Sequence, residues 1–167
     1  MPQLSSVSAE FTDRALDVVE QTLLAADWAC ERSEEGMIHC ASMTKWGEFG
    51  GMFAWRDEPA SLSFSLTLDL RAPNAKQSAI SELLRKINER LWLGHFDYWN
   101  DDGVAVFRHT IPMLDRLAPD PGEIAAVLTA ALDAADQFLP AFNFVVWAGK
   151  SPEEAVNAVL FETHGEA

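Results

Sequence analysis

The chain has 167 residues, of which 49% are hydrophobic and 23% are charged, as is ordinary for one globular domain. Its 12 Lys and Arg residues face 26 Asp and Glu residues, so the formal net charge at pH 7 is −14 and a polyanion would be repelled. These values exclude nucleic-acid binding as an expected function, and the apolar runs, all shorter than the roughly 20 residues that span a bilayer, predict no membrane segment.

A single domain is expected to span residues 1–167, because no linker, internal repeat or low-complexity tract interrupts the chain. The first residues, MPQLSSVSAE, lack the basic start and the apolar stretch of a secretory signal, so the expected compartment is the cytoplasm. Two cysteines cannot build a disulfide framework. The acidic surface is interpreted as solvated, with attraction of basic segments of partner proteins as the alternative.

The first predicted element is a helix that ends near Asp27. Its apolar residues recur every three or four positions, which is the helical period. This stripe consists of Phe11, Ala15, Val18, Thr22 and Ala26, flanked by Leu16, Val19 and Leu23. It is wide enough to face a core.

Three strands are predicted after this helix. The segment WACERSEEGMIHCASMTKW changes to an extended pattern around turn-forming residues from Ser33 to Gly36, which predicts a hairpin. GEFGGMFAWRD, residues 47–57, is predicted as the third strand. Within it, Gly50 and Gly51 indicate a bulge or a bend.

The fourth strand has the clearest pattern in the chain. In SLSFSLTLDL, which begins at Ser61, apolar and polar residues alternate without fault. One face is therefore expected to be buried and the other polar, as in an antiparallel sheet. The buried face would consist of Leu62, Phe64, Leu66, Leu68 and Leu70.

A second amphipathic helix is predicted after Pro73 and Asn74, which end the fourth strand. Its apolar residues are Ile80, Leu83, Leu84, Ile87 and Leu91. They again follow the helical period, so this helix is also expected to pack on the sheet.

A second hairpin is predicted in LGHFDYWNDDGVAVFRHT, with strands over residues 93–100 and 104–111. Asn100 to Gly103 favour a type I turn followed by Gly103 in the left-handed conformation. A loop of three residues would place His95 opposite His109. A register shift of one residue would separate these histidines to opposite faces.

Two further helices complete the chain. Asp120, Pro121 and Glu123 are typical of a helix start, and Pro140 is expected to kink or interrupt the helix that follows. The buried seam of that helix would consist of Ile124, Leu128, Ala131, Ala135 and Phe138. The segment from Ser151 to Glu154 is a capping box that opens the last helix.

The predicted order of elements is α-β-β-β-β-α-β-β-α-α. Strands joined by hairpins, with helices set apart from them, indicate an α+β domain with helices packed on one face of an antiparallel sheet.

Candidate metal ligands are present but poorly spaced. The chain contains no C-x-x-C and no H-E-x-x-H, and His39 and Cys40 are adjacent in a strand, which sends their side chains to opposite faces. We therefore predict no metal site. A hairpin centred on Glu35 makes Cys30 and Cys40 cross-strand neighbours, which favours two small core residues and leaves a redox-sensitive pair as the alternative.

No catalytic residue and no cofactor are predicted. His95 and His109, with Asp97 beside them, could perform acid–base chemistry, but the chain offers no nucleophile elbow and no convergent second acid. Histidines at the rim of a sheet are the favoured interpretation. Gly47, Gly50 and Gly51 precede neither a helix nor a lysine, as a phosphate loop requires, so nucleotide binding is not supported.

Aromatic residues point to an interaction surface. The predicted register places Trp99 and Phe107 on one face of the second hairpin and Phe96 and Tyr98 on the other. Both faces therefore carry apolar side chains that must be buried against another surface. A helix of the same chain, a partner subunit or a bound peptide could supply it. The expected interface residues are Phe96, Tyr98, Trp99, Phe107, Phe142, Phe144, Val145 and Trp147, and a homodimer is expected.

Two segments, LLRKINERLWLGHFDYWNDDGVAVFRHTIPM and ALDAADQFLPAFNFVVWAGKSPEEAVNAVL, resemble the YbjN family of bacterial sensory-transduction regulators. The resemblance runs from the first helix to the C-terminus, and its most telling pieces are Ile87-Asn88, Gly94-His95-Phe96, Val106-Phe107-Arg108 and Ala135-Asp136 before Pro140. It implies a fold like that of the type III secretion chaperones, which dimerise and bind protein segments. It implies no catalytic residues.

Two functional hypotheses follow. The first is a cytoplasmic, non-enzymatic regulator or chaperone-like protein that binds protein segments of unknown identity. The second is a small-molecule-binding protein with a pocket near Trp46, Trp55, His95 and His109.

Overall fold

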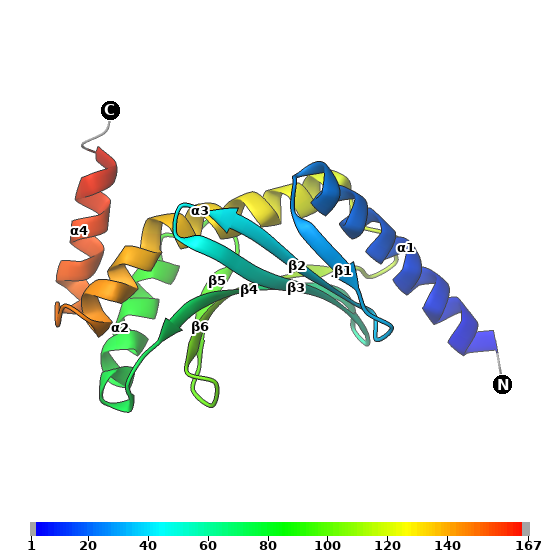
Figure 1. Ribbon diagram of the computed structural model, residues 1–167. Coiled ribbons are helices and arrows are strands. Elements are labelled where there is room, and N and C mark those ends of the chain that lie inside the picture. The colour runs from blue at the N-terminus through cyan, green and yellow to red at the C-terminus, as the bar shows by residue number, and fades with distance from the viewer. Residues whose placement is uncertain (1–2, 165–167) are drawn as a thin grey trace. The chain divides into compact units, whose positions relative to one another are not determined.

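The computed structural model of the protein describes residues 3–164, and the side chains of residues 9–162 (Figure 1). The helices are α1 (Gln3–Ala25), α2 (Gln77–Asn88), α3 (Pro121–Val146) and α4 (Pro152–His164), with a short 3-10 helix η1 (Asn74–Lys76). The strands are β1 (Ala29–Arg32), β2 (Met37–Thr44), β3 (Gly47–Asp57), β4 (Ala60–Arg71), β5 (His95–Trp99) and β6 (Val104–Pro112). Apart from η1, this is the predicted order, and the predicted α+β class with a six-stranded antiparallel sheet is confirmed.

The strands form one sheet in the order β1-β2-β3-β4-β6-β5. The chain folds into two compact units: unit 1 consists of Met1–Leu66 and Arg108–Thr129, and unit 2 consists of Thr67–Phe107 and Ala130–Ala167. Because β4, β6 and α3 each contribute residues to both units, the expectation of one domain stays a prediction.

In unit 1, α1 packs on β1, β2 and β3 (Figure 1). Its most buried side chains are Ala15, Leu16, Val19 and Leu23. Phe11, Val18 and Thr22 are only half-buried and Ala26 is exposed, so the centre of the predicted stripe was wrong by part of a turn. The observed face brings two leucines into the core in place of Thr22 and Ala26, which buries more apolar area.

The first hairpin follows its prediction, since β1 and β2 pair in antiparallel register with Cys30 opposite Cys40. The predicted bulge in β3 is wrong, because β2 and β3 pair without interruption from Met37 opposite Ala54 to Thr44 opposite Gly47. Gly51 has another role. A Cβ atom there would lie 3.0 Å from the Ser65 carbonyl oxygen and 3.2 Å from Cys40 Sγ, so the close approach of neighbouring atoms requires glycine.

The alternation of β4 is confirmed. Its five apolar side chains, Leu62, Phe64, Leu66, Leu68 and Leu70, are all at most 2% exposed. In unit 1, Phe64 lies against Phe53, with ring centroids 4.6 Å apart, and against Trp28 at 6.5 Å. Aromatic contacts of this kind centre the core of unit 1 on β4.

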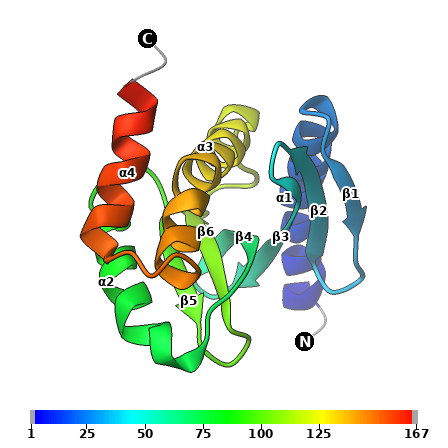
Figure 2. The same ribbon diagram turned by 60° about the vertical axis from the view of Figure 1, so that its left-hand side comes forward.

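The core of unit 2 is built on a second aromatic cluster. Phe96 of β5 contacts Phe107 of β6 and Phe142 of α3, in both cases edge to face with centroids 5.6 Å apart. In the same unit, α2 and α4 pack side by side (Figure 2). The predicted seam of α3 is buried along its whole length: Ile124, Leu128, Ala131, Ala135 and Phe138.

Asn88, at the end of α2, holds the outer strand of the sheet. Its side-chain nitrogen donates to the Phe96 carbonyl at 3.0 Å, and its oxygen accepts the Phe96 N–H at 2.8 Å. Since β5 is an edge strand, Asn88 supplies the two hydrogen bonds that a further strand would otherwise make.

Replacing Asn88 by alanine is therefore expected to lower the free energy of unfolding by about 1–3 kcal/mol, because two partly buried backbone groups lose their partners. Urea unfolding followed by circular dichroism measures this loss. Asn88→Asp keeps the acceptor but sets a carboxylate oxygen against the Phe96 carbonyl, so it should not restore the stability. A loss below about 0.5 kcal/mol for Asn88→Ala would show that the two bonds do not hold β5.

The loop of the second hairpin differs from its prediction. Gly103 has φ +68°, as expected, and its N–H donates to the Trp99 carbonyl at 2.7 Å. The loop between β5 and β6, however, has four residues, 100–103, and not three. The predicted register places Phe96 and Phe107 on opposite faces, but their rings are in contact on one face. The register that would place His95 opposite His109 is therefore wrong.

Helix α3 continues through Pro140, so the predicted interruption is wrong. The missing N–H of a proline costs one hydrogen bond, and the buried side chains on both sides of Pro140 offset that loss. By length and composition alone, α3 could cross a membrane. More than half of its apolar stretch is buried in the structure, however, as in the core helix of a globular domain.

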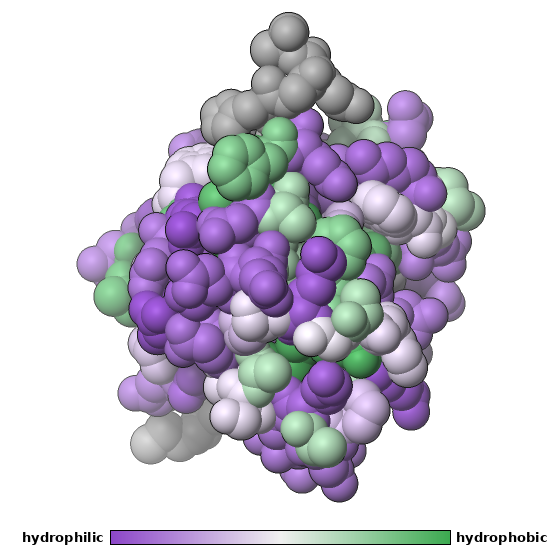
Figure 3. Space-filling model, turned by 90° about the vertical axis from the view of Figure 1, so that its left-hand side faces the viewer, coloured by the Kyte–Doolittle hydropathy of each residue, from purple (hydrophilic) through white to green (hydrophobic). Residues whose placement is uncertain are grey.

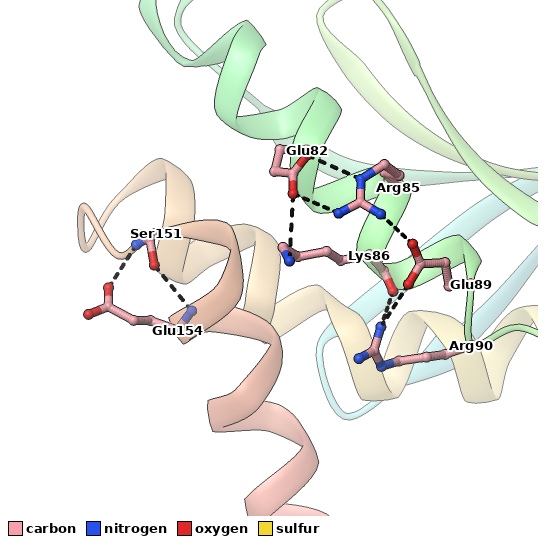
Figure 4. A network of polar contacts seen from close by, with 7 residues as sticks. All are labelled: Glu82, Arg85, Lys86, Glu89, Arg90, Ser151 and Glu154. Carbon is pink, nitrogen blue, oxygen red and sulfur yellow. Dashed lines mark hydrogen bonds and ion pairs between the residues drawn. The ribbon is translucent and has the colours of Figure 1, made fainter.

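The capping box of α4 is confirmed, and a charged face on α2 lies in the same unit (Figure 4). Ser151 Oγ accepts the Glu154 N–H at 3.2 Å, and Glu154 Oε2 accepts the Ser151 N–H at 2.9 Å. On α2, Arg85 donates to Glu82 at 2.9 Å and also pairs with Glu89. Lys86 of α2 and Arg90, just after the helix, pair with these same two acids, so the three cations do not form a free basic patch.

Candidate functional site

Unit 1 carries an apolar depression of about 390 Å³ beside Trp55, called the apolar pocket below. It lies where α1, the end of β3, the start of β4 and the loop after β6 come together. Its apolar lining consists of Phe11, Trp55, Ala60, Met113 and Leu117. Leu117 is 51% exposed, whereas Met113 is buried and forms the floor.

Asp115 and Arg116 complete the lining of the apolar pocket. Arg116 is held in place, because its guanidinium donates to Glu123 Oε1 at 3.0 Å and also pairs with Oε2. The hydrogen bond from Arg116 lowers the pKa of Glu123. The pair therefore stabilises the fold above the ordinary pKa of glutamate, and this contribution is lost as the pH falls through the lowered pKa.

A second, polar depression of about 840 Å³ is also lined by Trp55, and we call it the acidic pocket. It is formed by α1, the β1–β2 turn and the end of β3, and Trp55 lines both pockets. Its charged residues are Asp13, Arg32, Glu34, Glu35 and Asp57. Four acids against one arginine make this pocket strongly negative.

The acids of this pocket differ in how far they are already engaged. Arg32 donates to Asp13 Oδ1 at 3.0 Å and to Asp17 Oδ1 at 2.6 Å. Asp57 Oδ1 accepts the indole N–H of Trp55 at 2.9 Å, which restrains the indole ring. Glu34 and Glu35 are exposed, and within residues 9–162 neither has a hydrogen bond or ion pair.

The predicted interface residues fall into two groups. Phe96, Phe107, Phe142 and Val145 are at most 2% exposed, in the core of unit 2. Tyr98 and Phe144 are half-buried, and Trp99 and Trp147 are 37% and 70% exposed.

The second hairpin is more buried within the single chain than the sequence predicts, so fewer of its side chains need a partner to cover them. Val106 and Phe107, adjacent in β6, are both fully buried within the single chain. Both faces of this part of β6 are therefore already covered. Of the predicted interface residues, Trp99 and Trp147 are exposed and Tyr98 and Phe144 are half-buried, so these four remain available to a partner.

Of the residues predicted to line a small-molecule pocket, one lines the two pockets described above. Trp55 lines both pockets of unit 1, but Trp46, His95 and His109 line neither. Trp46 is 44% exposed, His95 is exposed and His109 is half-buried.

Cys30 and Cys40 are free thiols on adjacent strands. Burial raises the pKa of Cys40 to about 12, with the neighbouring Cys30 as the second cause, and burial and Glu20 raise the pKa of Cys30. Since the thiolate is the reactive form, these shifts favour packing over redox chemistry.

Sequence reasoning missed the apolar pocket. Its signal is the segment IPMLDRLAPDP, in which Met113, Leu114 and Leu117 are apolar residues in a connection between a strand and a helix. Apolar side chains in such a loop indicate either a floor for a pocket or an exposed contact.

Other exposed aromatic side chains were also missed. In unit 2, Trp92 is 78% exposed and Phe161 is 74% exposed. Hydrophilic residues cover most of the face that carries α2 and α4, with hydrophobic residues in small groups between them (Figure 3). Exposed residues that are scattered in this way do not define a site.

The comparisons with known proteins concern the family and the fold. The sequence profile of the YbjN family, described as "Putative bacterial sensory transduction regulator", matches residues 15–144. No curated protein sequence matches the chain.

Three solved structures are similar in fold. The crystal structure of YbjN from E. coli has a TM-score of 0.52 and 14% identity, over 72% of this chain and 84% of that one. The ExsC-ExsE complex has a TM-score of 0.50 and 16% identity, over 81% and 92%. The HopA1-SchA chaperone-effector complex has a TM-score of 0.48 and 10% identity, over 71% and 87%. The predicted fold is confirmed by the first two.

Proposed function

The chain belongs to the YbjN family, and from this membership we propose that it is a cytoplasmic, non-enzymatic regulator of a chaperone-like kind that binds segments of other proteins. Likeness of fold to the ExsC-ExsE complex supports a protein partner, since that structure contains two different proteins. The net charge of −14 argues against nucleic acid and against an anionic membrane surface.

One observation carries the proposal: the apolar pocket of unit 1 is open and presents aromatic and aliphatic side chains together. Leu117 is 51% exposed, and Phe11 and Trp55 are half-buried. Apolar residues clustered around a depression are typical of protein-binding surfaces, in which aromatic side chains contribute most of the binding energy. A side chain from a partner segment would cover this surface.

The non-enzymatic part of the proposal is supported by the geometry of the histidines. His95 and His109 are the pair from which acid–base chemistry was considered, and that pairing depends on the three-residue loop, which the structure does not have. Neither histidine lines the pockets beside Trp55.

The test uses a library of random 16-residue peptides displayed on phage, selected against the wild-type protein. Peptides recovered in this way are expected to bind wild type and to lose at least about tenfold in affinity with Leu117→Ser, because that change removes an apolar wall. Leu24→Ser is the matched control, since Leu24 is 59% exposed on α1 and lines neither pocket.

Fluorescence anisotropy with synthetic labelled copies of the recovered peptides measures both affinities. If no peptide is enriched, or if Leu117→Ser and Leu24→Ser weaken binding equally, the apolar pocket is not a site for protein segments.

The apolar pocket also fits the alternative function, since about 390 Å³ lies within the range of small-molecule sites. Native mass spectrometry distinguishes the two. A stoichiometric small molecule that copurifies with wild type and is lost from Leu117→Ser would favour the alternative.

We also expect a homodimer, formed through the exposed aromatic residues of unit 2, Trp99 and Trp147. An isologous interface would use each of these residues twice. Light scattering after size exclusion at micromolar protein would then give twice 18.5 kDa, and Trp147→Asp would reduce the mass to that of one chain. A wild-type mass of 18.5 kDa at every concentration would contradict the dimer.

A further inference from the structure

We infer that the two pockets beside Trp55 act together and select partner segments in which a large apolar residue lies close to a lysine or arginine. This inference rests on the proposed function and names the chemistry of the partner. It depends on three features of unit 1: the shared wall, the apolar lining and the unengaged acids.

Trp55 places the two pockets next to each other. Its ring lines the apolar pocket with Phe11, Met113 and Leu117, and it lines the acidic pocket with Glu34 and Glu35. The hydrogen bond from the indole N–H to Asp57 Oδ1, at 2.9 Å, holds the ring in this position. Because the two pockets share Trp55, we expect a segment whose apolar side chain enters the first pocket to present its neighbouring residues to the second.

We expect the bound segment to be extended. Residues in an extended chain rise about 3.3 Å each, and side chains two positions apart point to the same side. With an apolar residue in the first pocket, we therefore expect the side chain two positions away to be the one that meets the second. A long side chain at the adjacent position could also reach it.

The charge of the second pocket decides which side chain is favoured there. Arg32 already holds Asp13, and Trp55 engages Asp57, but Glu34 and Glu35 have no hydrogen bond or ion pair within residues 9–162. Two exposed carboxylates in a pocket lined by further acids attract a cation and repel an anion. Lys and Arg are the cations that a protein segment offers, and their apolar stems can cover the ring of Trp55.

The opposite charge on the partner also agrees with the whole molecule. A chain with a net charge of −14 repels acidic segments at long range and accelerates the encounter with basic ones. Because the acids lie in a pocket that shares Trp55 with the apolar pocket, we expect a preference for segments in which an apolar residue and a basic residue are close together in the sequence.

The test examines the peptides recovered from the random phage library against wild type. Lys or Arg is expected within two positions of a Leu, Ile, Met, Phe or Trp more often than in the unselected library. Glu34→Lys combined with Glu35→Lys should weaken the binding of their synthetic copies about tenfold, because two attractive contacts become repulsive.

The matched control is Asp101→Lys combined with Asp102→Lys, in the exposed turn between β5 and β6. Both double variants change the net charge equally, so only the position of the charges differs. The control should bind within about twofold of wild type in 0.15 M salt, where the screening length is about 8 Å. Circular dichroism of both variants checks that they fold.

The outcomes separate this inference from the proposed function. Peptides that depend on Leu117 but show no enrichment of Lys or Arg, or that bind the Glu34 and Glu35 variant as well as wild type, would overturn the inference and leave the apolar pocket as a binding site. An equal loss in the two double variants would also overturn it, because the effect would belong to the overall charge. If no peptide depends on Leu117, the proposed function fails as well.

Discussion

Replacing Leu66 by alanine is expected to lower the free energy of unfolding by about 2–5 kcal/mol. Leu66 is fully buried at the centre of the β4 alternation, with Phe64 and Leu68 two residues away on the same face. Removal of three carbon atoms from such a position costs their transfer free energy and leaves a cavity that a sheet cannot close. The total stability of a domain is about 5–15 kcal/mol, so the loss would be a large fraction of it.

Guanidinium chloride unfolding, followed by tryptophan fluorescence and circular dichroism, measures this effect. Thr67→Ala is the neighbouring control, because Thr67 is exposed on the opposite face of β4 and its replacement should change the stability by about 0.5 kcal/mol or less. Equal losses for the two variants would mean that the two faces of β4 are not distinguished by burial, against the alternation of the strand.

The order of elements and the buried face of β4 could be predicted because they depend on local patterns. The alternation from Leu62 to Leu70 predicts a strand with one buried face, and the capping box at Ser151 and Glu154 predicts the start of a helix. Each of these patterns lies within a few residues. Such signals survive in the folded chain because the local preference and the packing agree.

The wrong predictions concern features that depend on packing between segments distant in the sequence. From the sequence, Gly50 and Gly51 indicate a bulge or a bend, but the atoms that exclude a side chain at Gly51 belong to Cys40, Phe64 and Ser65, which only the folded sheet brings near. A loop longer by one residue at 100–103 changed which side chains of β5 and β6 share a face, although both strands had been located correctly.

The candidate site illustrates the same limit. Its residues come from α1, β3, β4 and the loop after β6, and no periodic pattern joins Phe11 to Met113. The sequence did indicate Trp55, as an aromatic residue near a pocket, but it grouped Trp55 with His95 and His109, which line neither of the two pockets. The acids at Glu34 and Glu35 were assigned to a turn, and their place beside an apolar pocket depends on the tertiary fold.

Val145→Asp is expected to abolish folding, and the comparison with Trp147→Asp shows why the two positions differ. Val145 is fully buried on α3, one turn after Phe142, whose ring contacts Phe96 in the core of unit 2. A carboxylate there would lose its hydration without gaining a partner, at a cost of at least about 3–5 kcal/mol, which is comparable with the whole stability of a domain.

Trp147 lies two residues further along the chain and is 70% exposed, so an aspartate there remains hydrated. Its expected cost is about 1 kcal/mol or less, including the unfavourable position of an anion at the end of a helix. Circular dichroism and thermal unfolding of the two purified variants measure the contrast, and the mass of Trp147→Asp in solution then reports on the dimer. If Val145→Asp folded with the stability of Trp147→Asp, the side chain at 145 would be accessible. It would then belong to an interaction surface and not to the core.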